Sequence, residues 1–174
     1  MKDNGRISVS FRIPREVLRI LEEEAKHRDL SLSAVVIKLL TKGAIFDLFI
    51  ENIHPITIAR ETFLAIINYV TEDELQHAGE LGGSRVPKSF FKQHNLKPTL
   101  SSLLREYFGR LEKYAGRFTA KQVPEEQKII LHHSLGMKWS CFLKGHITAT
   151  FRSILKMEPH IDMDESSVTI YLKQ

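Results

Sequence analysis

The sequence predicts an α+β fold, and two observations carry this prediction. Up to about residue 116, apolar side chains recur mainly at helical spacing. After that point the pattern changes to short alternating segments, two before and two after one long apolar helix. This order predicts an antiparallel sheet with helices on one face. The composition agrees, because 43% hydrophobic and 26% charged residues in a chain of 174 are typical of a globular protein.

The first forty residues predict a strand followed by two helices. Residues 6–13 alternate between polar and apolar side chains, as a half-buried strand does. Pro14 ends the alternation and suits the first turn of a helix, after which apolar residues recur at helical spacing. Ser31 or Ser33 offers an N-cap hydroxyl for a second helix, which we expect to end at Lys42-Gly43. The apolar strand positions are Ile7, Val9, Phe11 and Ile13.

This strand and its two helices cannot bury a core of their own, because they hold too few apolar residues. A single strand also leaves both of its backbone edges without partners. We therefore expect a twofold homodimer, in which two strands pair antiparallel and four helices cover their apolar face. The polar strand positions then lie side by side on an exposed two-stranded ribbon, which fits the major groove of DNA. These positions are Ser8, Ser10 and Arg12.

Residues 5–43 contain two diagnostic stretches with helically spaced apolar residues between them. The first stretch is Ser8-Val9-Ser10-Phe11-Arg12-Ile13-Pro14, and the second is Leu30-Ser31-Leu32-Ser33-Ala34. Together they resemble the ribbon-helix-helix DNA-binding domain, a family that includes the Arc and methionine repressors. The resemblance covers about a quarter of the chain and implies a DNA-binding and dimerisation module.

The resemblance implies that Ser8, Ser10 and Arg12 read base edges. Arg12 suits the O6 and N7 atoms of guanine, and a serine hydroxyl can donate to or accept from either type of base pair. Arg6 either contacts the phosphate backbone or lies in solvent. The alternative is that the strand only dimerises and that its polar face is solvated.

The resemblance also implies a phosphate bound at the start of the second helix, on Ser31, Leu32 and Ser33. Free backbone N–H groups and the positive end of the helix dipole favour an anion there. One difference from the family is Asp29, which occupies the turn where glycine is frequent. Aspartate tolerates a left-handed conformation but adds negative charge near the expected phosphate.

Residues 44–116 are interpreted as a helical segment. Thr57 can cap a first helix, and Thr71-Glu72-Asp73-Glu74 has the pattern of a capping box for a second one. We expect Gly82-Gly83 to end that helix, because glycine commonly follows the last helical residue. Two further helices are expected, over Ser89–His94 and over Thr99–Tyr114, the latter closed by Gly116.

Residues 117–174 predict a strand-strand-helix-strand-strand domain. The strands are expected at Arg117–Val123, Lys128–Leu135, His160–Asp164 and Val168–Leu172, and the helix at Gly136–Met157. This layout is similar to the small-molecule sensor domains of the vinyl-reductase-like group. The whole plan resembles that of the nickel-responsive repressor. These likenesses imply an effector or assembly domain joined to a DNA-binding dimer, with the small-molecule effector unidentified.

Eight histidines and one cysteine raise the question of a metal site or a catalytic centre. His133, Cys141 and His146 are suitable ligand types for zinc or nickel, but their spacing matches no metal-site pattern. The sequence has neither a nucleophile elbow nor a phosphate-binding glycine loop. We therefore expect no enzyme activity, no metal and no cofactor.

The net charge of +4 is unevenly distributed. Residues 85–121 carry nine Lys or Arg against two Asp or Glu, whereas residues 44–84 carry one against seven. We interpret the basic stretch as a solvated helical face that complements the acidic stretch, and a second nucleic-acid surface is the alternative. The lone cysteine suits a reducing compartment, and the sequence contains neither a membrane span nor a secretory signal. We therefore expect a cytoplasmic protein without membrane contact.

These observations predict a prokaryotic transcription regulator of the repressor type. It would bind double-stranded DNA as a homodimer, or as a higher oligomer built from such dimers. The alternative is a protein-interaction module, such as an antitoxin-like partner, that uses the ribbon only to dimerise. The folded domain expected at the C-terminus differs from the disordered tail that is usual in antitoxins.

Overall fold

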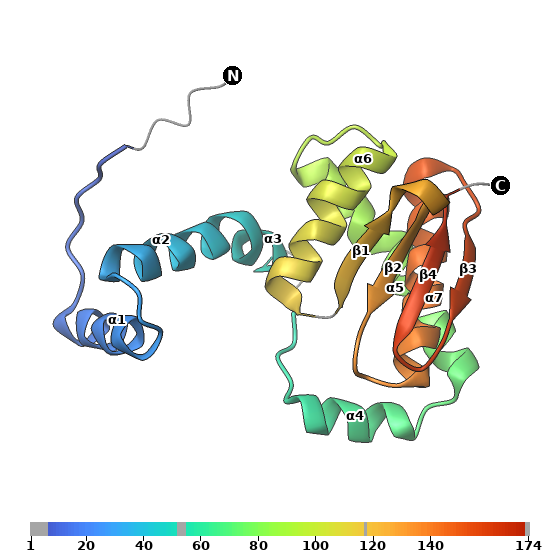
Figure 1. The fold of residues 1–174 in the computed structure, drawn as a ribbon, viewed down its shortest axis with the longest axis horizontal. Coiled ribbons are helices and arrows are strands. Elements are labelled where there is room, and N and C mark those ends of the chain that lie inside the picture. The colour runs from blue at the N-terminus through green and yellow to red at the C-terminus, as the bar shows by residue number, and fades with distance from the viewer. Residues whose placement is uncertain (1–6, 52–54, 117, 173–174) are drawn as a thin grey trace. The chain divides into compact units, whose positions relative to one another are not determined.

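The computed structural model describes residues 7–51, 55–116 and 118–172. The chain divides into two compact units, Met1–Ala44 and Ile45–Gln174. Helices and a four-stranded antiparallel sheet are both present (Figure 1), so the α+β expectation is confirmed. None of the helices in the described ranges is both long enough and apolar enough to cross a membrane.

The N-terminal unit contains two helices joined by a tight turn. Helix α1 (Arg15–His27) follows Pro14, and helix α2 (Leu32–Lys42) follows Ser31. The Ser31 hydroxyl accepts a hydrogen bond from the Ala34 N–H at 3.1 Å, so Ser31 is the N-cap residue. Both helices lie where the apolar spacing predicted them.

The strand predicted at residues 6–13 is not present in the single chain. Residues 7–14 have no regular secondary structure, and Arg6 lies outside the described residues. The described secondary structure of this unit is helical, so the structure does not support the ribbon-helix-helix arrangement. The physical reason is that a strand depends on hydrogen bonds to a neighbouring strand, and one copy of this unit has a single such segment.

The C-terminal unit begins with helices and ends with strands around one long helix, in the predicted order. Its helical part contains α3 (Leu48–Ile50), α4 (Arg60–Asn68), α5 (Glu72–Gln93), α6 (Leu100–Ser102) and the π-helical turns η3 (Leu103–Phe108) and η4 (Leu111–Ala115). A further π-helical turn, η1 (Gly43–Asp47), spans the boundary between the units. The rest consists of β1 (Thr119–Val123), the 3-10 turn η5 (Pro124–Glu126), β2 (Lys128–His132), α7 (Met137–Thr150), the π-helical turn η6 (Phe151–Leu155), β3 (His160–Met163) and β4 (Ser167–Tyr171).

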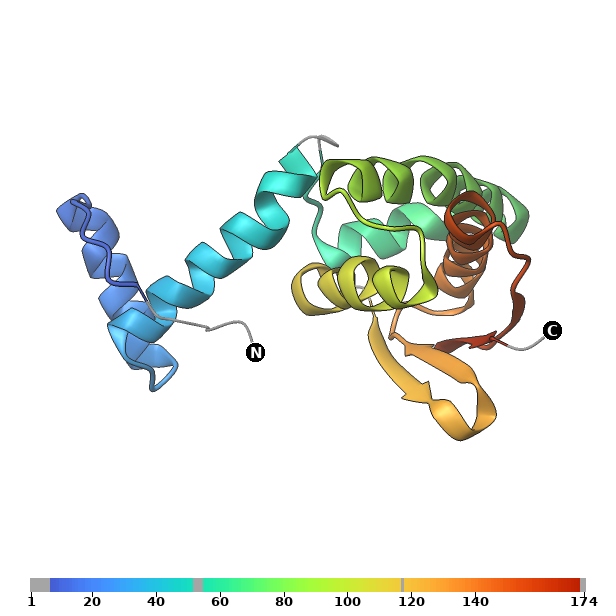
Figure 2. The ribbon, with the colours of Figure 1, turned by 90° about the horizontal axis from the view of Figure 1, so that it is seen from above.

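The four strands form one antiparallel sheet in the order β1-β2-β4-β3. In the register of β2 with β4, Ile129 lies opposite Ile170 and Leu131 lies opposite Val168. All four residues are buried, because they share the face of the sheet that the helices cover (Figure 2). The apolar residues that alternate along β2 and β4 therefore determine the face of the sheet on which the core forms.

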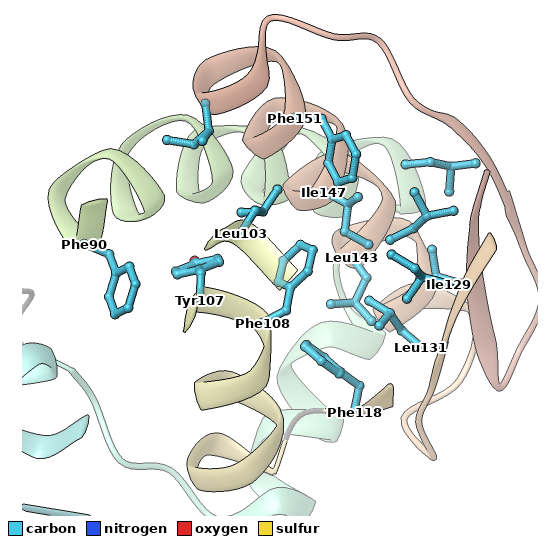
Figure 3. Close-up of a cluster of buried hydrophobic side chains, with 14 of the residues drawn as sticks. Phe90, Leu103, Tyr107, Phe108, Phe118, Ile129, Leu131, Leu143, Ile147 and Phe151 are labelled. Carbon is cyan, nitrogen blue, oxygen red and sulfur yellow. The ribbon is translucent and has the colours of Figure 1, made fainter. Parts of the chain in front are cut away.

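One hydrophobic core lies between the helices and the sheet of the C-terminal unit (Figure 3). Phe90 of α5 and Tyr107 of η3 are each 1% exposed, and Leu131 of β2 is completely buried. Phe90 and Tyr107 also pack ring against ring, with centroids 5.3 Å apart. The helical segment before residue 116 and the sheet after it therefore enclose the same core.

Helix α5 overturns one sequence expectation. Its start is as predicted, because the capping box of Thr71 and Glu74 is present. The expected stop at Gly82-Gly83 is wrong, since the helix continues through both glycines to Gln93. The separate helix expected over Ser89–His94 is the last part of α5, with His94 as its C-cap.

The glycines are explained by the close approach of α5 to α7. At three positions a Cβ atom would overlap a backbone carbonyl oxygen of the opposite helix, so a side chain cannot be accommodated without moving the helices apart. The distances from the Cβ atom to that oxygen would be 2.1 Å for Gly79 to Phe142, 2.1 Å for Gly83 to His146 and 2.0 Å for Gly145 to Gln76.

Pro87 lies inside α5 and adds a second link to α7. Proline has no N–H, so the Gly83 carbonyl four residues earlier loses its usual helical donor. The hydroxyls of Thr150 in α7 and Ser153 in η6 both lie 3.4 Å from that carbonyl oxygen. Their shorter hydrogen bonds go to the carbonyls of His146, at 2.7 Å, and of Thr150, at 3.2 Å, so the Gly83 carbonyl receives only weak, shared donors from the opposite helix.

Gly79→Ala is expected to lower the free energy of unfolding by about 3 kcal/mol, because the added methyl group forces α5 away from α7. Urea unfolding followed by circular dichroism measures this change. Gly109→Ala is the matched control, since its Cβ atom would make an ordinary 3.5 Å contact with the Leu104 carbonyl oxygen. Equal stability of the two variants would show that the close approach is not required.

Candidate functional site

The predicted base-reading residues Ser8, Ser10 and Arg12 lie on the segment before α1, and all three are exposed. Within the described part of the chain, no hydrogen bond or ion pair ties their side chains to another residue. Arg6, which was predicted to contact phosphate, lies outside the described residues. The three described side chains are therefore accessible to a partner molecule.

The apolar positions of the same segment are exposed as well. Ile7 is 86% exposed, Val9 75% and Phe11 57%. In the described part of this unit, the buried apolar residues are Ala25 and Val35. A unit with so little buried apolar surface and so much exposed needs a further surface to cover it. The other large apolar residues that it exposes are Val17, Ile20, Leu30, Ile37, Leu39 and Leu40.

The predicted phosphate-binding residues come together at the start of α2. The Ser31 hydroxyl is already engaged as the N-cap, and the Ser31 carbonyl accepts from the Val35 N–H at 3.1 Å. The N–H groups of Leu32 and Ser33 belong to the first turn, where a helix offers no internal acceptor. These two N–H groups and the helix dipole can bind an anion.

Asp29 adopts the left-handed conformation that glycine takes in many helix ends, with φ at 52°. The Leu30 N–H donates to the Ala25 carbonyl at 2.9 Å, and the Asp29 N–H donates to the Lys26 carbonyl at 3.3 Å. This pair of bonds is a Schellman motif, which ends α1 and turns the chain toward α2. Asp29 therefore has the backbone conformation that glycine commonly adopts after a helix, and its side chain lies two residues before Ser31.

A serine and a histidine of the C-terminal unit are hydrogen-bonded, but they do not form a catalytic pair. The Nε2 atom of His133 lies 2.9 Å from the Ser140 hydroxyl, and the Nδ1 atom accepts from the Leu135 N–H at 3.3 Å. Burial lowers the pKa of His133, which favours the neutral ring. Because Nδ1 accepts, the ring proton is on Nε2 and points to the serine. His133 therefore cannot withdraw a proton from Ser140 as a general base.

The histidines and the cysteine are also not gathered around a metal position. In the described part of the chain, no cluster of three or more His, Cys, Asp or Glu side chains has a metal-binding arrangement. His146 lies 3.1 Å from the Tyr107 hydroxyl through its Nε2 atom, whereas His133 is bonded to Ser140. Burial raises the pKa of the Cys141 thiol, which favours the neutral form that binds metals poorly.

Arg110 differs from the other described cations of residues 85–121, because it is partly buried and contacts the backbone and a core ring. Its Nη1 atom donates to the Ile45 carbonyl at 3.0 Å, and its guanidinium lies 5.1 Å from the ring centroid of Phe90. Its Nη2 atom pairs with Glu106 at 3.2 Å. The exposed cations of this stretch are Arg85, Lys88, Lys92, Lys97, Arg105, Lys113 and Lys121.

A cavity of about 840 Å³ in the C-terminal unit was not predicted from the sequence. Its walls come from α4 and the residues before it, from α5, η4, the β1–β2 hairpin and the start of α7. No local sequence pattern marks such a cavity, because its residues are far apart along the chain. The lining includes the aromatic residues Phe63, Phe118, Trp139 and Phe142 and the charged residues Arg60 and Glu112.

Comparison of the chain with protein-family models, with curated proteins and with solved structures found no match.

Substitutions at Asp29 are expected to change stability in opposite directions. Asp29→Gly should raise the free energy of unfolding by about 0.5–1 kcal/mol, because glycine has no steric cost at this φ value. Asp29→Ala should lower it by about 1 kcal/mol, because alanine lacks a side chain that favours the left-handed region. Thermal unfolding of the full chain measures both, and a shift in the same direction for both variants would contradict the assignment of the turn.

Proposed function

We propose that this protein is a DNA-binding transcription regulator whose N-terminal units pair as a ribbon-helix-helix dimer. The observation that carries the proposal is the alternating segment whose apolar residues Ile7, Val9 and Phe11 are exposed beside two helices with little core. A second copy supplies both missing elements. Its segment is the strand partner, and its helices cover the apolar face of the paired strands.

In such a dimer, the side chains of Ser8, Ser10 and Arg12 from both chains project from the face opposite the core. A two-stranded ribbon of this kind enters the major groove. Arg12 then bonds the O6 and N7 atoms of guanine, and the serine hydroxyls complete the contact pattern. The twofold symmetry of the dimer favours palindromic or repeated half-sites.

The start of α2 fixes the position of the dimer on the DNA backbone. The N–H groups of Leu32 and Ser33 donate to a phosphate oxygen, and the helix dipole adds to the attraction. Asp29 lies close in sequence and opposes this attraction by its charge. In this proposal, the phosphate contact orients the ribbon on the DNA and does not contribute to sequence preference.

In this proposal, the C-terminal unit either senses a small-molecule effector or assembles dimers into a higher oligomer. It has an extensive core of its own, which distinguishes it from the disordered tail of an antitoxin-like partner. A ligand or a neighbouring dimer bound to this unit changes DNA affinity if it favours one arrangement of the dimer over another. The regulator acts in the cytoplasm, where its DNA is located.

Arg12→Ala is expected to reduce affinity for the DNA upstream of the protein's own gene by about 1–3 kcal/mol for each lost guanine contact. Fluorescence anisotropy of labelled DNA measures this change, with random-sequence DNA as the reference. Lys88→Ala is the matched control, because Lys88 is an exposed cation outside the ribbon. We expect Lys88→Ala to leave the preference for the upstream DNA unchanged.

A Ser8/Ser10/Arg12 triple alanine variant makes the same test stricter. It should lose the preference for the upstream DNA at both low and high salt. Binding that survives the triple substitution and collapses with salt would contradict ribbon readout and indicate the basic stretch at residues 85–121. A chain that binds no DNA but binds the product of an adjacent gene would support the protein-interaction alternative.

A further inference from the structure

We propose that the cavity beside α4 binds a small carboxylate with an extended apolar body. The cavity volume of about 840 Å³ lies in the range of pockets that hold drug-sized ligands. It belongs entirely to the C-terminal unit. This inference rests on the proposed function, in which the bound carboxylate is the effector of the regulator. Because carboxylate binding is measured without DNA, the cavity proposal and the DNA-binding proposal can fail independently.

The apolar body is indicated by the aromatic residues of the cavity wall. Trp139 stacks on Phe142, with ring centroids 4.7 Å apart, and meets Phe63 of α4 at nearly a right angle, with centroids 5.4 Å apart. Phe118, just before β1, also lines the cavity. Aromatic walls of this kind favour a ligand that buries apolar surface against them.

A polar group on the ligand is indicated by the indole of Trp139. The residue is only 6% exposed, and its Nε1 atom has no hydrogen-bond partner among the described residues. A buried N–H without an acceptor costs about 1–3 kcal/mol. The ring of Phe63 offers at most a weak acceptor. A ligand oxygen in the cavity would satisfy this donor.

The sign of the ligand charge is indicated by Arg60, at the start of α4. Its Nη2 atom donates to the carbonyl and the hydroxyl of Ser134, at 2.6 and 3.1 Å. No described carboxylate lies within ion-pair distance of Arg60, so these neutral partners leave its charge uncompensated. Glu112 also lines the cavity, and its Oε1 atom accepts from the Ala120 N–H at 2.9 Å. This neutral donor leaves the carboxylate uncompensated as well, so the expected preference for an anion rests on the donors of Arg60 and Trp139 and not on the net charge of the lining.

The polar groups of the cavity therefore include the indole N–H of Trp139, which has no acceptor among the described residues, and the guanidinium of Arg60, which has neutral acceptors but no described ion-pair partner. A carboxylate supplies acceptor oxygens and the opposite charge together. Helix α4 covers the cavity with few buried residues, since Ile67 is its buried residue whereas Ile66 is 51% exposed. An apolar ligand adds packing surface beneath this helix.

The single tryptophan of the chain is Trp139, so its fluorescence reports on the cavity alone. We would titrate the full chain with decanoate, and with 1-decanol as the uncharged match. Decanoate is expected to change Trp139 fluorescence saturably at one molecule per chain. Decanol is expected to bind at least tenfold more weakly. The absence of a saturable change, or equal affinity for the two probes, would overturn the proposal.

Arg60→Gln is expected to weaken decanoate binding at least tenfold and to leave decanol binding unchanged. Retained decanol binding also shows that the cavity is intact in the variant. Arg152→Gln is the matched control, because Arg152 pairs with Glu158 and does not line the cavity. Unchanged decanoate affinity in Arg60→Gln, or an equal loss in both variants, would overturn the role of Arg60.

Discussion

The C-terminal unit depends on the direct contact between the backbones of α5 and α7. Gly79, Gly83 and Gly145 remove the side chains that would otherwise keep the two helices apart. The close pair then presents apolar residues in two directions, Phe90 of α5 toward Tyr107 and Ile147 of α7 toward the sheet (Figure 3). Because protein cores are close-packed, a shift of one helix would be transmitted to both of these surfaces.

The same helix pair also forms part of the cavity. The start of α7 contributes Trp139 and Phe142, and α5 contributes Leu75. These residues belong to the closely packed helix pair, whereas α4 on the other side of the cavity has Ile67 as its buried residue. A ligand in this position would bridge a fixed wall and a lightly packed helix. This is a suitable arrangement for a sensing unit, because ligand binding can then change the position of one element without disturbing the core.

The N-terminal unit has the opposite property, since it buries few apolar residues and exposes many. Ala25 and Val35 are its buried apolar residues in the described part, while Phe11 and Ile37 are more than half exposed. If the N-terminal units pair as we propose, folding of this unit is coupled to association, and its stability depends on the concentration of the chain. The side chains of Ser8, Ser10 and Arg12 would then be aligned only in the dimer.

Local patterns allowed much of the fold to be predicted from the sequence. The period of two in β2 and β4 and the Thr71 capping box are local signals, and the structure contains both elements. Gly82-Gly83 misled the prediction, because a glycine that permits a helix contact looks in sequence like a glycine that ends a helix. The segment predicted as a strand at residues 6–13 has the right period, but the structure has no strand in its described part, residues 7–13, because the chain offers it no neighbouring strand.

The two candidate sites, the N-terminal segment and the cavity, also differ in how far they could be predicted from the sequence. Ser8, Ser10 and Arg12 could be selected from the sequence because they alternate within one short segment. The cavity could not, because Arg60 and Trp139 are 79 residues apart in the chain and meet only through the tertiary fold. Long-range proximity of this kind leaves no periodic signal.

Sedimentation velocity of the full chain tests the central claim, that the N-terminal segments of two copies pair. The wild-type chain is expected to sediment as a dimer, and Phe11→Asp as a monomer at the same concentration, because the aspartate places a charge on the buried face of the ribbon. Tyr69→Asp is the control, since Tyr69 is 93% exposed and lies in the C-terminal unit, and it should remain dimeric. A monomeric wild-type chain, or a Phe11→Asp variant that remains dimeric, would contradict the account.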